Sequence, residues 1–174
     1  SNDKMQRYIS NCYSMGIDVI SPSINLSGID FTIKKDQILF GLSAIKNLGD
    51  SAIRNIIENR NKLGIFKSFS DLCDRLPSNI LNKRNIESLI HCGALDEFSE
   101  NNNRAQLFSD LEYVMEWASS RNRDRISGQG NLFDSISKSD NKEFSLSKGS
   151  KVEDYSLIEK LKLEKELLGF YLSD

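Results

Sequence analysis

The sequence predicts a mainly α-helical fold: a tandem helix-hairpin-helix with one small β-hairpin, followed by a flexible linker and a C-terminal helix. Three observations predict it. Residues 41–60 place a tight Asn-Leu-Gly turn between two short amphipathic segments. Residues 82–96 repeat that arrangement in a degenerate form, with Cys-Gly-Ala-Leu as the break. Residues 103–121 carry apolar side chains at three- and four-residue spacing, which is typical of a long helix with one buried face.

Composition limits the class of protein. The chain has 174 residues, of which 39% are hydrophobic, so it can bury one or two small cores. No stretch is long and apolar enough to cross a bilayer, so no membrane role is expected. Cys12, Cys73 and Cys92 lack the paired spacing of disulfides or zinc sites, which fits a reducing cytoplasm. The net charge of −2 argues against coating nucleic acid by bulk electrostatics, so any phosphate binding must depend on local geometry.

The N-terminal part predicts a helix and then a hairpin. Residues 3–15 have helical apolar spacing, and Gly16 stands where a C-terminal cap belongs. This helix is expected to enter from a preceding domain. Residues 30–33 and 37–40 flank a Lys-Lys-Asp turn as a short β-hairpin, the only convincing β signal in the chain.

The remaining segments alternate between helix and loop. Ser68 to Asp71 has capping-box spacing and predicts a short helix that includes Leu72. Residues 127–154 are rich in Ser, Gly, Lys and Asp and lack periodicity, which predicts a flexible linker. Residues 154–168 regain helical spacing, and Gly169 is the expected stop.

The first hairpin turn is a candidate phosphate-binding site. Gly49 can adopt the left-handed or closely approachable backbone that such a turn needs. The helix that opens after it begins with amides that lack intrahelical partners and suit a phosphate, with two cations nearby. The candidate DNA-binding residues are Lys46, Asn47, Leu48, Gly49, Asp50, Ser51, Ala52 and Arg54. The alternative is an ordinary helical hairpin in which Gly49 is only a turn residue.

The second turn adds Gly93 and Ala94 as candidate DNA-binding residues. Asp96 and Glu97 stand where a phosphate would approach, and they would repel it. A structural copy that only completes the paired unit is therefore the competing interpretation.

No residue is assigned a catalytic or metal-binding role. His91 adjoins Cys92, but no second Cys or His lies at ligand spacing, so packing between helices is the better interpretation. Acidic residues such as Asp71 and Asp74 are interpreted as helix caps or solvated surface groups. No cofactor is expected in this chain.

The order of these segments resembles one family, the alpha (catalytic) subunits of bacterial DNA polymerase III. The blocks that carry the resemblance are residues 15–19, 22–25, 38–42, 44–46, 89–96 and 164–173. Two positions depart from the family pattern, which usually has Asp at Ser23 and Gly at Asn47. Asn tolerates the left-handed conformation, so the second departure keeps the turn possible.

The resemblance implies a division of the chain. Residues 1–28 correspond to the end of the fingers region, 29–125 to the tandem helix-hairpin-helix domain, 126–153 to the linker, and 154–174 to a helix that leads into a further domain. The carboxylates that hold Mg²⁺ for polymerisation in this family belong to a palm domain that is not in this chain. The chain would then be a non-catalytic section of a DNA-directed DNA polymerase that binds double-stranded DNA through its backbone.

The linker contains a candidate clamp-binding peptide. Two apolar residues inside a solvated segment can anchor in a partner's pocket. The resemblance implies that this peptide docks on the sliding clamp, the beta subunit, and that other replisome subunits are partners of the whole polymerase. The candidate residues are Gln129, Gly130, Asn131, Leu132 and Phe133. An accidental apolar pair that folds back on its own domain is the alternative.

Two other function classes stay open. The chain could be an all-α protein-interaction module whose hairpins serve only its fold. It could also be a helix-hairpin-helix piece of a DNA repair enzyme.

Overall fold

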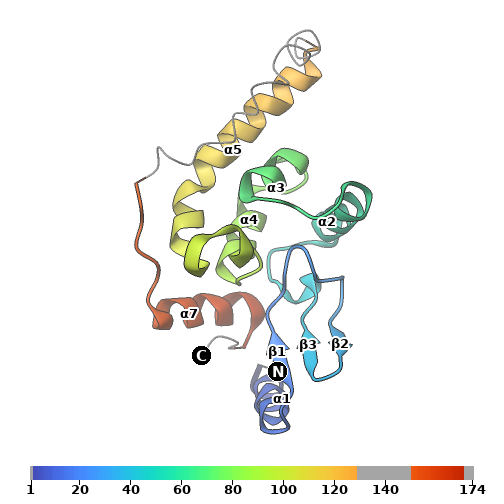
Figure 1. Ribbon diagram of the computed structural model, residues 1–174, viewed down its shortest axis with the longest axis vertical. Helices are drawn as coiled ribbons and strands as arrows, with labels where there is room; N and C mark the ends of the chain where they lie inside the picture. Colours follow the sequence, from blue (N-terminus) through green and yellow to red (C-terminus); the bar gives the residue numbers. More distant parts are fainter. Residues whose placement is uncertain (1, 129–149, 171–174) are drawn as a thin grey trace.

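The computed structural model describes residues 2–128 and 150–170, and it is mainly helical as the sequence predicts (Figure 1). Its α-helices are α1 (Asn2–Ser14), α2 (Asp50–Leu63), α3 (Phe69–Arg75), α4 (Lys83–His91), α5 (Arg104–Ile126) and α7 (Leu157–Leu168). Its strands are β1 (Asp18–Ile20), β2 (Thr32–Lys34) and β3 (Gln37–Leu39). Its 3₁₀ turns are η1 (Leu42–Ala44), η2 (Asp96–Phe98) and η3 (Glu100–Asn102). None of the described helices is long and apolar enough to span a membrane.

The predicted β-hairpin is confirmed, but it is part of a three-stranded sheet. β2 pairs antiparallel with β3, placing Ile33 opposite Ile38. β1 adds to the other side of β3 in parallel, with Val19 beside Ile38. The sequence did not predict β1, because three residues are too few to show a strand pattern and β1 takes its hydrogen bonds from a distant partner. Gly16 follows the end of α1 with a φ of +74°, as predicted for a C-terminal cap.

The first hairpin departs from the two helices expected before and after its turn. The segment before the turn is only the 3₁₀ turn η1, whereas the segment after it is the full helix α2. Gly41 explains part of the difference. A Cβ at Gly41 would lie 2.3 Å from the carbonyl oxygen of Ile29, so the chain must cross the preceding loop closely there. Too few residues then remain before Asn47 for a longer helix.

One apolar core joins the two hairpins. Its fully buried side chains include Ile56 of α2, Leu72 of α3, Leu89 of α4 and Leu111 of α5. Ser68 caps α3, since its side chain accepts a hydrogen bond from the Asp71 amide at 3.0 Å, as the capping spacing predicts. The hairpins therefore form a single packed body.

The long helix α5 is confirmed and continues past the predicted end at Arg121 to Ile126. Its buried residues stop at Ala118, and the last turns project beyond the rest of the body (Figure 1). Two ion pairs brace this projecting part, because Arg121 and Arg125 both contact Asp74 of α3, at 3.2 and 2.7 Å. These ion pairs link the projecting part of α5 to α3.

The helix α7 packs into the same body. Leu168 and Phe170 are buried, and the Phe170 ring lies 4.8 Å from that of Phe40. Ser156 begins α7 with a capping box, and Gly169 ends it at a φ of +83°, as the sequence predicts. Within the described residues, α7 is therefore a component of the hairpin body.

Candidate nucleic-acid interface

The first hairpin turn is exposed and anchored by one side chain. Asn47 and Gly49 are exposed, whereas Leu48 between them is only 7% exposed and belongs to the core. The buried Leu48 residue anchors the turn in the core, and its two neighbours lie at the surface. A ligand could therefore meet the main chain of Asn47 and Gly49 here.

The left-handed residue of this turn is Asn47, not Gly49. Asn47 has a φ of +67°, whereas Gly49 has an extended backbone with φ −75° and ψ 163°. Of the two backbone forms that the sequence allowed for Gly49, the structure does not show the left-handed one, and the tolerance for that conformation expected of Asn47 is confirmed. The physical reason is that Gly49 is the N-cap of α2, a position that requires an extended backbone. A Cβ at Gly49 would have no atom within 4 Å, so Gly49 leaves open space.

The amides around the turn are available to a ligand. The first helical hydrogen bond of α2 runs from the Ile53 N–H to the Gly49 carbonyl oxygen, at 3.1 Å. The preceding helix amides have no intrahelical partner by geometry, and Gly49 has no side chain to cap them. The amides of Leu48 and Gly49 also donate to no acceptor within residues 2–128 and 150–170. Such a row of amides at a helix start suits an anion.

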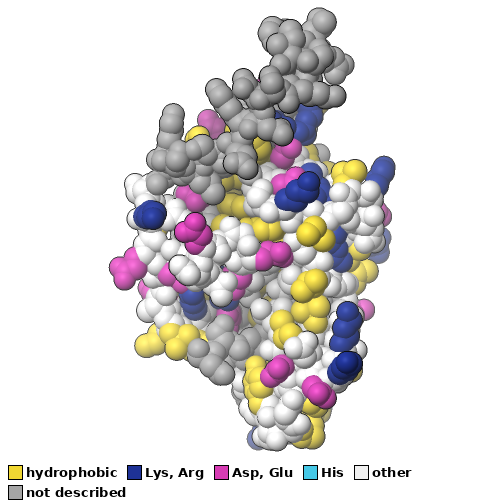
Figure 2. Space-filling view, viewed as in Figure 1, with side chains coloured by type: hydrophobic (Ala, Val, Ile, Leu, Met, Phe, Trp, Pro, Cys, Tyr) yellow, Lys and Arg dark blue, Asp and Glu magenta, His cyan; other side chains and the backbone are white. Residues whose placement is uncertain are grey.

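The charges near the turn are mixed. Lys46 and Arg54 are exposed, as the sequence predicts, and can reach toward a bound phosphate. Asp50 and Ser51 are exposed in the first turn of α2, where the Asp50 carboxylate would oppose an anion. Ala52 is buried, so only its backbone can take part. Figure 2 shows both acidic and basic side chains on one face, with several basic ones toward the right of the view. Because Asp50 lies between Lys46 and Arg54 in the sequence, a phosphate at the turn would depend mainly on the backbone amides.

Sequence reasoning missed Asn85, which contacts this turn from α4. Its Nδ2 donates to the Asn47 carbonyl oxygen at 2.7 Å. Asn85 also forms a capping box with Asn82, through bonds of 3.0 and 2.9 Å. The spacing of Asn82 and Asn85 could have revealed the cap, but no sequence signal reveals the contact with Asn47.

The second turn is buried. Gly93, at a φ of +93°, ends α4 in a Schellman motif, in which its amide donates to Ile90 and the Ala94 amide donates to Leu89. Gly93 and Ala94 are both buried, and a Cβ at Gly93 would lie 2.6 Å from the Arg104 guanidinium. These amides cannot reach a phosphate without rearrangement. The structure therefore favours the alternative in which the second hairpin completes the fold, and Gly93 and Ala94 drop out of the candidate site.

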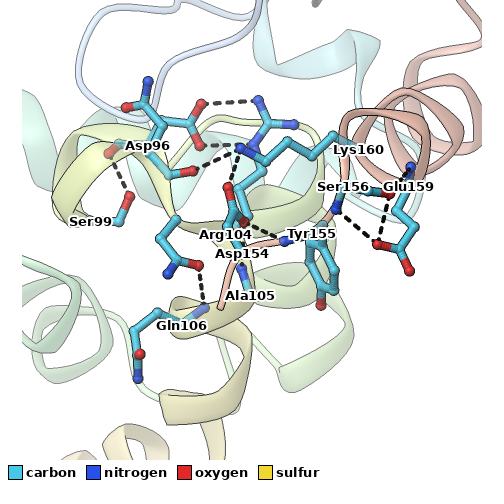
Figure 3. A network of polar contacts seen from close by, with 12 residues as sticks. Asp96, Ser99, Arg104, Ala105, Gln106, Asp154, Tyr155, Ser156, Glu159 and Lys160 are labelled. Atoms are coloured by element: carbon cyan, nitrogen blue, oxygen red, sulfur yellow. Dashed lines mark hydrogen bonds and ion pairs between the residues drawn. The ribbon is translucent and has the colours of Figure 1, made fainter. Parts of the chain in front are cut away.

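A buried charge network occupies the space beside the second turn (Figure 3). Arg104 donates to Asp96 at 2.9 and 3.0 Å and to Glu164 of α7 at 2.8 Å. Arg104 and Glu164 are 5% and 0% exposed. Asp96, which the sequence places near the second turn, is thus paired with Arg104 inside the protein. Because Arg104 also binds Glu164, the network connects α7 to the second hairpin.

The segment before α7 is fastened to the start of α5. Asn103 donates to the Val152 carbonyl at 2.8 Å, and Gln106 accepts from the Val152 amide at 2.7 Å. Asp154 accepts from the Ala105 amide and pairs with Lys160 of α7 (Figure 3). These contacts lower the pKa of Asp154 against the opposing effect of its burial. Residues 152–154 thus pack against the N-terminal end of α5.

His91 and Cys92 serve packing in the described structure. His91 Nε2 lies 3.2 Å from the Tyr155 hydroxyl, and its ring is 4.9 Å from that of Phe108. Burial lowers the pKa of His91 and raises the pKa of the Cys92 thiol to about 12. Among the described residues, no group of three His, Cys, Asp or Glu side chains is placed to hold a metal ion.

The candidate clamp peptide, Gln129 to Phe133, lies outside the described residues. The described chain reaches Gly128, just after the projecting end of α5.

Comparison with known protein families identifies the class of fold to which the two hairpins belong. The helix-hairpin-helix motif family matches residues 16–107, which include both hairpins up to the start of α5. The chain therefore belongs to the helix-hairpin-helix family.

The resemblance to DNA polymerase III subunit alpha is also confirmed. The subunit from Thermus aquaticus is 40% identical over 172 residues, and the one from Deinococcus radiodurans is 41% identical over 175 residues. Each comparison covers 99% of this chain and 13% of the relative. The subunit from Bacillus subtilis is 34% identical over 175 residues, covering 100% of this chain and 15% of the relative. The chain thus spans about one seventh of the length of these relatives.

Proposed function

We propose that this chain is a section of a bacterial DNA polymerase III alpha subunit that holds duplex DNA by its phosphate backbone. The observation that carries the proposal is the exposed first turn, where the amides of Leu48 and Gly49 adjoin the uncapped start of α2. Contacts from main-chain amides to phosphate read no bases, and this suits an enzyme that copies any sequence.

The electrostatics support a small, local contact. A protein with a net charge of −2 gains little from a general field around DNA. A phosphate at the turn would instead take charge-assisted hydrogen bonds from several amides and the positive end of α2. Lys46 and Arg54 would supply cations whose long side chains adjust to the DNA.

A duplex titration tests this part of the proposal. A fluorescent duplex of mixed sequence and a second duplex of unrelated sequence should bind equally well. The logarithm of affinity should fall linearly with the logarithm of salt concentration, with a slope of about −1 to −2 if one or two phosphates are held. Absence of binding at low salt would contradict DNA contact and would favour the protein-interaction module.

The second part of the proposal concerns the sliding clamp. Gln129, Leu132 and Phe133 would dock on the clamp, with the two apolar side chains in a pocket and Gln129 at its rim. The support is the sequence of the peptide and its place directly after α5, whose end projects from the body (Figure 1). DNA held by the first turn would raise the effective concentration of the peptide near a clamp on the same duplex, so weak docking suffices.

Polymerisation itself is proposed for parts of the longer protein beyond this chain, with Mg²⁺ held there. The chain alone should then extend no primer on a primed template with Mg²⁺ and nucleotides. Extension that persists through purification would contradict the assignment. A role in DNA repair receives less support, because relatives aligned over 99% of the chain are named DNA polymerase III subunit alpha.

A further inference from the structure

The backbone of the first turn is held from outside its own hairpin. The Lys46 amide donates to the Leu167 carbonyl of α7 at 2.9 Å. One residue later, the Asn47 carbonyl accepts from Asn85 Nδ2 of α4 at 2.7 Å. Both bonds join segments far apart in the sequence, so the conformation of the turn depends on tertiary contacts.

The bond from Asn85 fixes the direction of the next amide. In a trans peptide the C=O and N–H groups point in opposite directions. Since the Asn47 oxygen points at the buried side chain of Asn85, the Leu48 N–H of the same peptide points away from it. That N–H has no acceptor within the described residues.

Asn85 is itself held rigidly. It is 8% exposed, and its Oδ1 accepts from the Asn82 amide at 3.0 Å while its own amide donates to Asn82 Oδ1. The amide group of Asn85 is therefore oriented by the cap of α4, and only its Nδ2 is left for the first turn. The cap of α4 uses the Oδ1 and the backbone amide of Asn85, so the Nδ2 donor serves only the contact with Asn47.

We propose that Asn85 is a positioning residue for phosphate binding: its Nδ2 orients the Asn47–Leu48 peptide so that the Leu48 N–H is presented to the DNA backbone. The inference rests on the proposed function for its DNA consequence. The orientation of the turn by Asn85 is testable without DNA.

The test compares two substitutions in the 174-residue chain. Asn85→Asp keeps an oxygen to accept from the Asn82 amide, but it removes the donor to Asn47. Asn82→Asp adds the same charge at the exposed position of the cap and keeps the Asn85 donor, so it controls for the charge. At Asn85, which is buried, the Asp would also place a carboxylate oxygen against the Asn47 carbonyl oxygen. Circular dichroism and thermal unfolding should therefore check that both variants keep the parent fold.

Asn85→Asp should shift the NMR signals of the Leu48 and Gly49 amides, whereas Asn82→Asp should leave them near their parent positions. Duplex affinity should fall about tenfold in Asn85→Asp, as expected for the loss of one hydrogen bond that orients a charged contact. The deficit should persist at raised salt, where the effect of the added charge is screened.

Two results would overturn the proposal. One is an unchanged Leu48 amide signal in Asn85→Asp, whatever the DNA affinity. The other is an equal loss of affinity in both variants that disappears with salt. If the parent chain binds no duplex, the proposed function fails, and the amide signals still decide whether Asn85 orients the turn.

Discussion

Replacing Gly49 by Val separates a phosphate-binding turn from a purely structural one. Gly49 has an extended backbone that Val adopts readily, and its missing Cβ faces open space. The variant therefore meets no steric conflict in the free protein. The added bulk would lie where a phosphate approaches the first amides of α2.

The stability change should be small. Val is a poorer N-cap than Gly, at a cost of about 0.5–1 kcal/mol. Loss of backbone freedom in the unfolded chain offsets roughly 0.4–1 kcal/mol of this. A chain of 174 residues shifts its Tm by about 2–4 °C per kcal/mol, so the Tm should stay within about 2 °C of the parent.

The binding change should be large. A hydrogen bond to a charged group contributes about 1.5–3 kcal/mol, so its loss weakens duplex affinity roughly 10- to 100-fold. Fluorescence anisotropy with a short duplex measures the affinity, and circular dichroism with thermal unfolding checks the fold.

The control is Gly28→Val, since Gly28 also has open space around its missing Cβ but lies in the loop before the β-hairpin. It should bind DNA as the parent does. If Gly49→Val keeps its Tm and binds duplex within about twofold of the parent, the turn holds no phosphate and the proposed DNA contact is wrong.

Three further outcomes are expected. Replacing Leu132 and Phe133 together by Ala should abolish binding in a sliding-clamp titration and leave duplex affinity unchanged, because the pair serves only the clamp. Glu164→Ala should lower the free energy of unfolding in urea by about 3 kcal/mol, because it leaves the buried Arg104 with one carboxylate partner instead of two. Because burial lowers the pKa of His91, the unfolded chain binds its proton more readily, so stability should fall as pH drops below about 6.5, as measured by urea unfolding.

Each outcome has a contrasting control. Ile136→Ala changes an apolar residue outside the five candidate residues and should keep most clamp affinity, and equal affinity of the double variant and the parent would remove the clamp site. Glu116→Ala removes an exposed carboxylate from α5 and should change stability little, so an equal effect of both Glu variants would contradict the role of the buried network. His91→Gln should remove the pH dependence between about pH 7.5 and 5.5, and a slope that survives the substitution must come from another group.

Local chemistry allowed the sequence to predict most helices and both turns. The stops at Gly16 and Gly169 were predictable because each needs a positive φ that other residues adopt at a cost. The cap at Ser68 was predictable because its spacing from Asp71 is fixed by the helix itself. The blocks of sequence shared with DNA polymerase III alpha subunits likewise identify the family without the fold.

The sequence could not predict features that arise between distant segments. β1 has only three residues and exists because β3 offers it hydrogen bonds. The first segment of the first hairpin shortened to η1 because the chain must pass closely over Ile29. The sequence allowed either a left-handed or a closely approachable backbone at Gly49, and only the structure shows that Gly49 is the extended N-cap of α2 while Asn47 takes the left-handed conformation.

By itself, then, the sequence determined the helical pattern, the turn residues and the family, since these depend on neighbours within one or two turns of helix. Only the tertiary structure decided which turn is exposed. Core packing and the Arg104 network bury the second turn, and they leave the first turn at the surface. Only packing brought Asn85 of α4 to the Asn47 carbonyl, 38 residues away, because a hydrogen bond between separate elements leaves no periodic trace in the sequence.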